Sequence, residues 1–219
     1  RPLQDDVWEL YDVRSDFSLA NDLASKEPGK LAELQALFLK EAERYHVLPL
    51  DDRFYERLQA KLVGRPELMG DRTSITLAEG MTGMMEGVFI NVKNRSKTIA
   101  AEVEVPANGG NGTIIAQGGR FGGWSLYVKD GVPAYDYNFL GLQRTSIVAA
   151  KPLAPGRHTI RFDFAYDGGG PGKGGTGTLA VDGVKVAEGR LPHTQFGIFS
   201  ADETADVGVD LGTPVVEAI

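Results

Sequence analysis

From about residue 72 onward the chain alternates between apolar and polar positions and shows no helical period longer than two turns. Residues 117–141 show this most clearly, because Trp124, Leu126 and Val128 are interleaved with Ser125, Tyr127 and Lys129. Successive side chains of a strand point to opposite faces, so this stretch predicts a half-buried strand. Asp130-Gly131 tolerates the positive φ angles of a two-residue hairpin, which predicts a return strand over residues 132–139.

The same alternation continues on both sides of this hairpin. It predicts strands over residues 99–105, 113–117, 158–166, 178–181 and 184–188, and Asp182-Gly183 marks a second tight hairpin. Strands at this spacing, separated by Gly and Pro turns, predict a mainly β fold, an antiparallel β-sandwich of the concanavalin A-like jelly-roll type. Glycines at 118, 119, 122 and 123 predict a bulge or a close backbone approach. No helix follows them, which argues against a phosphate-binding loop.

The first 65 residues show a different pattern of apolar and polar positions. Residues 7–13 alternate weakly and predict a short strand, and residues 16–21 resemble a turn. Leu31, Leu34, Leu37 and Phe38 fall at helical spacing and predict a helix reaching Tyr45. A second helix is predicted over residues 52–63, ended by Gly64 and Pro66. We therefore divide the chain into residues 1–65, a strand with two helices, and residues 66–219, the sandwich.

Charge and composition narrow the function classes. The 219 residues carry a net charge of −7 and no basic run longer than two residues, which argues against a nucleic-acid partner. There is no cysteine, so disulfides and thiolate metal ligands are excluded, although the compartment, cytoplasmic or periplasmic, stays open. No apolar run reaches membrane-spanning length, so no membrane partner is expected. The abrupt start at Arg1-Pro2 suggests a piece of a longer protein.

Three groups of residues are candidates for chemistry. His46, His158 and His193 have no metal-binding spacing, and none is predicted to be catalytic. The acidic cluster from Asp202 to Asp210 could hold Ca²⁺, but a solvated loop is the favoured interpretation, so no metal site is predicted. An arginine and three aromatic residues could form a sugar-stacking, substrate-binding platform, with the alternative that the rings are core; they are Arg120, Trp124, Tyr135 and Tyr137.

Several stretches resemble one enzyme family. Trp8-Glu9-Leu10-Tyr11-Asp12-Val13, then Asp16, then Asn21-Asp22-Leu23-Ala24 resembles a segment near the end of the sulfatase catalytic fold. That family commonly has Pro and Glu where this chain has Phe17 and Leu19. Residues 47–53 resemble the continuation in large bacterial arylsulfatases, and residues 92–96, 118–129 and 167–183 resemble the sandwich that those enzymes append. The order of the sandwich strands also resembles laminin-G and concanavalin-like domains.

The resemblance implies a parent enzyme that hydrolyses sulfate esters with a formylglycine and a Ca²⁺ ion. The formylglycine motif, C/S-x-P-x-R, is absent from this chain, so no catalytic residue or cofactor is transferred and the chain is expected to be inactive alone. The favoured function is a structural or oligomerisation module that contacts the parent's catalytic domain or a second copy of itself. The alternatives are a module that binds a sulfated glycan, and an independent sandwich glycosidase using a pair such as Glu102 and Glu104.

Overall fold

The computed structural model describes residues 3–50, 64, 66–217 and 219. The chain separates into two compact units, Arg1–Pro66 and Glu67–Ile219, and each is described by itself. The domain boundary predicted from the sequence lies between residues 65 and 66. None of the helices in the described part of the chain is both long enough and apolar enough to cross a membrane.

The first unit contains a short 3-10 helix, η1 (Leu3–Asp5), and one α-helix, α1 (Pro28–Arg44). The predicted first helix is confirmed: it begins at a proline, whose fixed φ suits the first turn, and Arg44 favourably occupies its last turn. Trp8 packs edge-on against Phe38 of α1, with ring centroids 5.4 Å apart. The predicted second helix, residues 52–63, lies outside the described residues.

The strand predicted over residues 7–13 is wrong. These residues form no strand in the structure, since no other described segment offers them a ladder of backbone hydrogen bonds. Instead the Leu10 backbone N–H donates to Asp22 Oδ1 at 2.9 Å, and the Leu23 N–H donates to the Leu10 carbonyl at 2.7 Å. The predicted turn at residues 16–21 is present, and Asp16 accepts hydrogen bonds from the backbone of Ala20 and Asn21.

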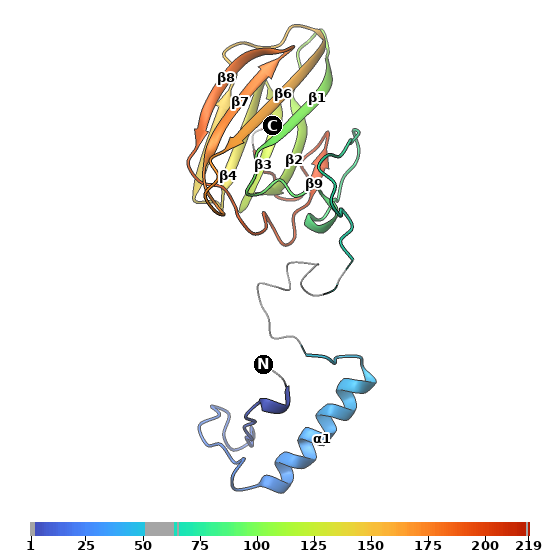
Figure 1. Cartoon of the computed structure of the whole chain (residues 1–219), viewed down its shortest axis with the longest axis vertical. Coiled ribbons are helices and arrows are strands. Elements are labelled where there is room, and N and C mark those ends of the chain that lie inside the picture. Colours follow the sequence, from blue (N-terminus) through green and yellow to red (C-terminus); the bar gives the residue numbers. More distant parts are fainter. Residues whose placement is uncertain (1–2, 51–63, 65, 218) are drawn as a thin grey trace. The chain divides into compact units, whose positions relative to one another are not determined.

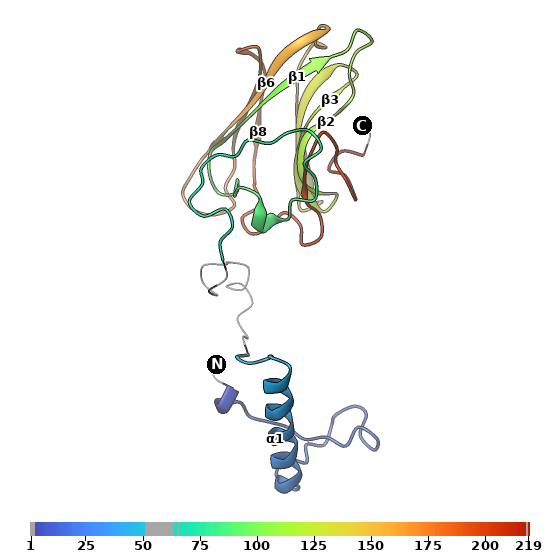
Figure 2. The same ribbon diagram turned by 90° about the vertical axis from the view of Figure 1, so that its right-hand side faces the viewer.

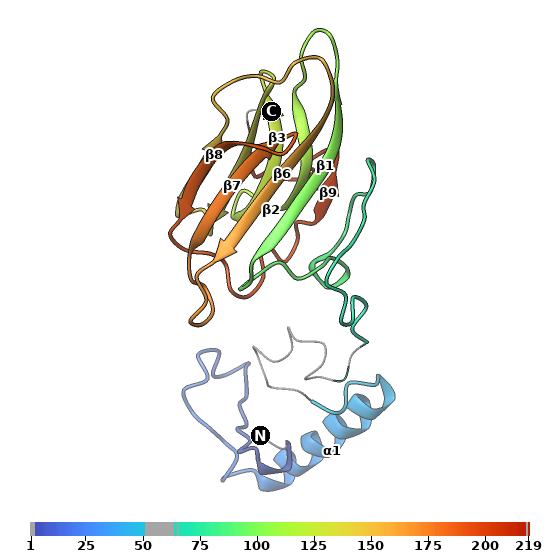
Figure 3. The ribbon, with the colours of Figure 1, turned by 45° about the horizontal axis from the view of Figure 1, so that its top comes forward.

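The second unit is a sandwich of two antiparallel sheets, so the predicted mainly β fold is confirmed. One sheet has the order β1-β6-β7-β8 and the other β5-β4-β3-β2-β9. Figure 1 labels every strand except β5, Figure 2 shows the two sheets as separate layers, and Figure 3 looks onto the four-stranded sheet. A 3-10 turn, η4 (Glu86–Val88), precedes the first strand. The strands are β1 (Lys97–Val105), β2 (Gly112–Gly119), β3 (Gly122–Lys129), β4 (Val132–Phe139), β5 (Gln143–Val148), β6 (Gly156–Tyr166), β7 (Gly175–Val181), β8 (Val184–Leu191) and β9 (Ala205–Val207).

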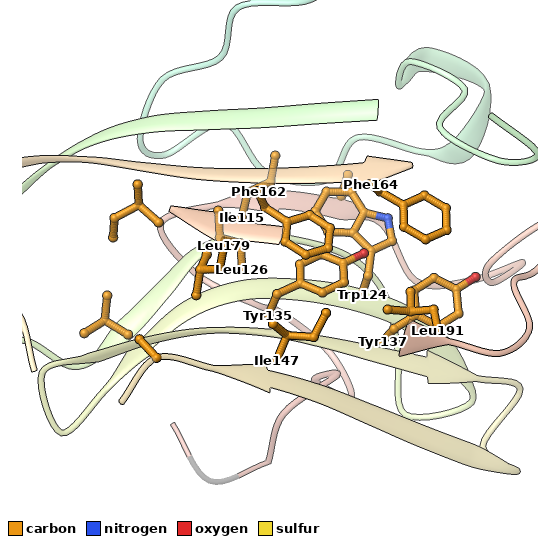
Figure 4. Packing of buried hydrophobic residues seen from close by; sticks show 14 of the residues in the cluster. Ile115, Trp124, Leu126, Tyr135, Tyr137, Ile147, Phe162, Phe164, Leu179 and Leu191 are labelled. Carbon is orange, nitrogen blue, oxygen red and sulfur yellow. The ribbon is translucent and has the colours of Figure 1, made fainter. Parts of the chain in front are cut away.

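The core lies between the sheets and is rich in aromatic rings. Tyr135 of β4 stacks on Phe162 of β6, with centroids 3.6 Å apart and planes 10° apart. Figure 4 shows this stack with Trp124 beside it, surrounded by aliphatic residues such as Ile115 and Leu179. Rings from both sheets therefore interdigitate across the interior, as expected for a sandwich.

Both predicted tight hairpins are confirmed. Asp130 and Gly131 have φ angles of 51° and 77°, and Asp182 and Gly183 have 50° and 79°. Positive φ at both central residues matches the right-handed twist of the flanking strands.

The central strand β3 departs from its prediction, because both of its faces are buried rather than one. Trp124, Leu126 and Val128 face the core, but Ser125 and Tyr127 are also at most 6% exposed. In Figure 2 the C-terminal segment lies on the outer side of β2 and β3. The Arg120 N–H donates to the Thr213 carbonyl at 3.0 Å, which ties this segment to the sheet.

We expect Gly183→Val to destabilise the sandwich by about 1–3 kcal/mol, because a β-branched residue is strained at positive φ. An added Cβ at Gly183 would meet nothing within 4 Å, so the loss reports backbone strain alone. The measurement is the free energy of unfolding in urea. The matched control is Gly197→Val, at an equally open site without a positive φ, where a smaller change is expected. Equal losses in the two variants would contradict the assignment.

Candidate functional site

The structure separates the four residues predicted to form the sugar-stacking platform. Trp124, Tyr135 and Tyr137 are 1%, 0% and 3% exposed and lie in the core between the sheets (Figure 4). The Trp124 indole N–H donates to Gln117 Oε1 at 3.1 Å, and the Tyr137 hydroxyl accepts from the Gln195 backbone N–H at 2.6 Å. These three rings are core residues, which was the alternative interpretation, and they do not form a binding surface.

Arg120 lies elsewhere, in the turn between β2 and β3. Its side chain is 58% exposed, and Nε lies 3.0 Å from Glu217 Oε1. The next residue, Phe121, is 74% exposed, which is unusual for so large an apolar ring. The only predicted site residue at the surface is therefore accompanied by an aromatic side chain that the sequence analysis did not select.

A hollow of about 450 Å³ lies beside this turn. We call it the arginine hollow; it is lined by Arg120, Phe121, Gly141, Arg144, Val216 and Glu217. Three parts of the second unit meet there: the β2–β3 turn, the start of β5 with the loop before it, and the C-terminal segment. Leu142, in the loop before β5, is 81% exposed.

A buried amide holds the two turns of the arginine hollow together. Asn138 near the end of β4 is 1% exposed. Its Nδ2 donates to the carbonyls of Gly119 at 3.0 Å and Arg120 at 2.7 Å, and its Oδ1 accepts from the Gly141 N–H at 3.0 Å. One side chain thus satisfies three backbone groups in two different turns, which makes the hollow a built feature of the sheet end.

Glycine allows the backbones to approach closely at this end of the sheet. A Cβ at Gly119 would lie 2.3 Å from the Thr213 carbonyl oxygen, and one at Gly123 would lie 2.4 Å from the Gln117 carbonyl oxygen. The close backbone approach predicted from the glycines around Arg120-Phe121 is confirmed.

The chemistry of the arginine hollow suits binding an anion. Arg144 Nη1 donates to the Val215 carbonyl, and Arg120 is paired with Glu217. Two guanidinium groups and one carboxylate leave a surplus of positive charge, and guanidinium pairs well with the oxygens of sulfate esters and carboxylates. The lining residues include no serine, histidine or other nucleophile.

The acidic residues near the C-terminus hold loops in place. Asp206 is 2% exposed and accepts from the Gly83 N–H at 2.7 Å. Asp210 accepts from the Val215 N–H at 2.8 Å, and burial raises the pKa of Asp210 to about 6. Glu203 accepts from the Thr213 N–H at 3.1 Å. Within the described ranges, no three acidic or histidine side chains converge into a group that could hold a metal ion.

The remaining candidates have structural surroundings. His158 Nδ1 lies 2.7 Å from Asp182 Oδ2 and Nε2 lies 2.8 Å from the Ala154 carbonyl, so both ring nitrogens are occupied. The hydrogen bond that the His158 ring donates to the Asp182 carboxylate raises the pKa of His158. Glu102 and Glu104 lie on the exposed face of β1, and Glu104 is 3.9 Å from Arg157.

Comparisons with known proteins found similar solved structures and no related sequence. No protein-family model matches the sequence, and no curated protein matches it. Domains LG4-5 of the mouse laminin alpha1 chain are similar with a TM-score of 0.40 and 16% identity, over 57% of this chain and 30% of that chain. The LG1-3 region of the laminin alpha2 chain gives a TM-score of 0.38 and 17% identity, over 58% and 23%. The match thus spans less than a third of either structure, and the sandwich assignment rests on the strand order itself.

We expect Asn138→Ala to lower the free energy of unfolding by about 2–4 kcal/mol, because it leaves several buried backbone groups without a partner. The measurement is urea denaturation. The control is Asn111→Ala. The Asn111 Oδ1 accepts from the Asp130 N–H at an exposed turn, so its removal should lower the free energy of unfolding by less than about 1 kcal/mol. A loss at Asn138 no larger than at Asn111 would contradict its role in joining the two turns.

Proposed function

We propose that this chain is a non-catalytic part of an arylsulfatase, in which the sandwich is an appended structural module. The ordered set of sulfatase-like stretches through the chain supports this parentage. The sequence also lacks C/S-x-P-x-R, so the formylglycine chemistry and its Ca²⁺ would belong to the rest of the parent enzyme.

The observation that carries the proposal is the apolar surface of the first unit. Within residues 3–50, the buried hydrophobic residues are Leu10 and Ala42. By contrast Phe17 is 92% exposed, and Leu34 and Leu37 of α1 are 39% and 49% exposed. A unit that leaves its own apolar stripe in water needs a partner surface.

The parent's catalytic domain is the partner that fits this surface. The stretches that resemble the end of the sulfatase catalytic fold, residues 8–24, lie in the same unit as α1, and Trp8 packs directly on α1. The alternative occupants are the sandwich of the same chain and a second copy of the chain, and the following experiment separates them from the catalytic domain.

The test is to produce the polypeptide encoded upstream of this chain together with the 219-residue chain, and to purify one through a tag on the other. We expect the two to co-purify and Leu34→Asp with Leu37→Asp to reduce recovery at least about tenfold, since two buried charges cost several kcal/mol. Leu142→Asp, at an exposed leucine of the sandwich, is the matched control and should leave recovery unchanged.

The same samples test catalysis. With an aryl sulfate and Ca²⁺ the 219-residue chain should match buffer, and turnover should require the upstream polypeptide. Turnover by the chain alone, or an upstream region without the C/S-x-P-x-R motif, would reject the proposal. A dimer of the chain that dissociates with the Leu34 and Leu37 substitutions would instead assign the apolar face to self-association.

A second candidate function is binding of a sulfated glycan at the arginine hollow. The observation that favours it is Phe121, an exposed ring that lines the hollow together with Arg120 and Arg144. A sugar ring could pack on the phenyl face while a sulfate ester takes bidentate hydrogen bonds from Arg120 or Arg144. In this candidate site Phe121 takes the stacking role that the sequence analysis gave to Trp124, Tyr135 and Tyr137, which lie in the core.

For this candidate we expect the chain to bind dextran sulfate and not uncharged dextran, with affinity that falls as salt is added. Arg144→Gln and Phe121→Ala should each weaken binding about tenfold, the loss of one charge-assisted or stacking contact. Arg157→Gln, which removes an 89% exposed side chain on β6, is the matched control. Equal weakening by all three substitutions would indicate non-specific charge attraction and contradict the site.

A further inference from the structure

A second, much smaller cavity lies inside the sandwich, lined by residues of both sheets. We call it the lysine chamber; it is lined by Val92, Lys93, Asn94, Lys97, Tyr135, Tyr137, Phe164, Leu191, Thr194, Gln195 and Phe199. Its volume of about 10 Å³ is room for the centre of one water-sized particle. The lining is aromatic, yet it holds two lysines: Lys93 is buried, and Lys97 at the start of β1 is half-buried.

One of these lysines has a counter-ion and the other does not. Lys93 Nζ pairs with Glu86 Oε1. Lys97 Nζ lies 4.6 Å from the centroid of the Trp124 ring, which is only 1% exposed. Among the described residues Lys97 Nζ makes no hydrogen bond and no ion pair, so no carboxylate at the chamber compensates the charge of its ammonium form.

The hydroxyl of Tyr135 is also without a partner. Tyr135 is fully buried, and among the described residues its hydroxyl and Ser125 Oγ are the buried side-chain polar atoms that make no hydrogen bond. Figure 4 shows this hydroxyl on the side of the Tyr135 ring that faces Trp124. A buried hydroxyl without a partner destabilises the fold, and a bound ligand that accepts from it removes that cost.

The oxygens around the chamber, in contrast, already accept hydrogen bonds. One carboxylate oxygen of Glu86 pairs with Lys93 Nζ, and the other accepts a hydrogen bond from the Phe199 N–H at 3.2 Å. Asn94 Oδ1 accepts from the Gly172 N–H at 2.8 Å, and Gln195 Oε1 accepts from the Phe196 N–H at 2.9 Å. The groups at the chamber that lack a hydrogen-bond partner are Lys97 Nζ and the Tyr135 hydroxyl, and both can donate.

We infer that the lysine chamber binds one small monovalent anion of about the size of chloride, held by Lys97 Nζ and the Tyr135 hydroxyl. An anion accepts hydrogen bonds from both groups and neutralises the uncompensated charge. A water molecule could also accept from these two donors, but it carries no charge and would leave the ammonium group of Lys97 uncompensated.

Binding of the anion is coupled to a proton. Burial, and then the positive charge of Lys93, lowers the pKa of Lys97 to about 7. The other titratable groups at the chamber are Lys93, Tyr135, Tyr137 and the adjacent Glu86; burial raises the pKa of both tyrosines, so they stay protonated. Because the anion prefers the ammonium form, its affinity should fall about tenfold for each pH unit above 8.

The solution test measures the thermal unfolding midpoint of the full 219-residue chain while sodium chloride replaces sodium gluconate at constant ionic strength. At pH 6.5 chloride should raise the midpoint, and at pH 9 the required chloride concentration should rise about tenfold or more. Lys97→Met should abolish the chloride response and Tyr135→Phe should weaken it. Lys129→Met, which removes an exposed charge at the end of β3, should keep it.

The same chloride response in Lys97→Met and Lys129→Met would overturn the inference. A crystal grown in sodium bromide provides the second measurement and does not depend on the stability of Lys97→Met. An anomalous peak beside Lys97 Nζ and the Tyr135 hydroxyl is expected. Density for water without anomalous signal would show that no anion binds.

Discussion

The sandwich depends on aromatic rings that stack across its two sheets. Tyr135 projects from the five-stranded sheet and Phe162 from the four-stranded sheet, and their planes lie only 10° apart. Space for these rings comes from glycine: a Cβ at Gly177 would lie 2.8 Å from the Phe162 ring and 2.6 Å from Ile147. Large rings on one strand therefore require missing side chains on the next. The same packing fixes the Tyr135 hydroxyl in the interior, which is why a polar chamber exists inside an apolar core.

Local chemistry was enough to predict some elements and could not predict others. The Asp-Gly hairpins and α1 follow from residues adjacent in sequence, so their patterns were decisive. Strand β5 was missed because Ile147 is its only buried residue and the four residues before it are polar. Strand β9 has three residues and exists because β2 and Met84 both pair with it. The predicted strand at residues 7–13 failed for the opposite reason, since it has strand-like residues and no described neighbour to pair with.

The candidate site also depends on contacts between residues far apart in sequence, which a local pattern cannot predict. Alternation identifies Trp124, Tyr135 and Tyr137 as sharing a face with their neighbours, but cannot say whether that face is the interior. Phe121 and Arg144 line the same hollow, at a place where Asn138 bonds to a turn 18 and 19 residues away in sequence. The one sequence signal for that hollow was the set of glycines around Arg120-Phe121, which marked the close backbone contact without identifying what it would display.

The sheet edges of the sandwich also decide how it can be carried on a larger polypeptide. In the described structure β1 and β8 form the edges of one sheet, and β5 and the short β9 those of the other. The outer positions of β1 and β8 carry charged residues such as Glu102, Glu104, Lys185 and Glu188, and β9 offers only three residues for pairing. Charged and very short edge strands discourage the addition of a foreign strand. Such a module resists aggregation through its edges, which leaves side-chain surfaces rather than open backbone for its contacts.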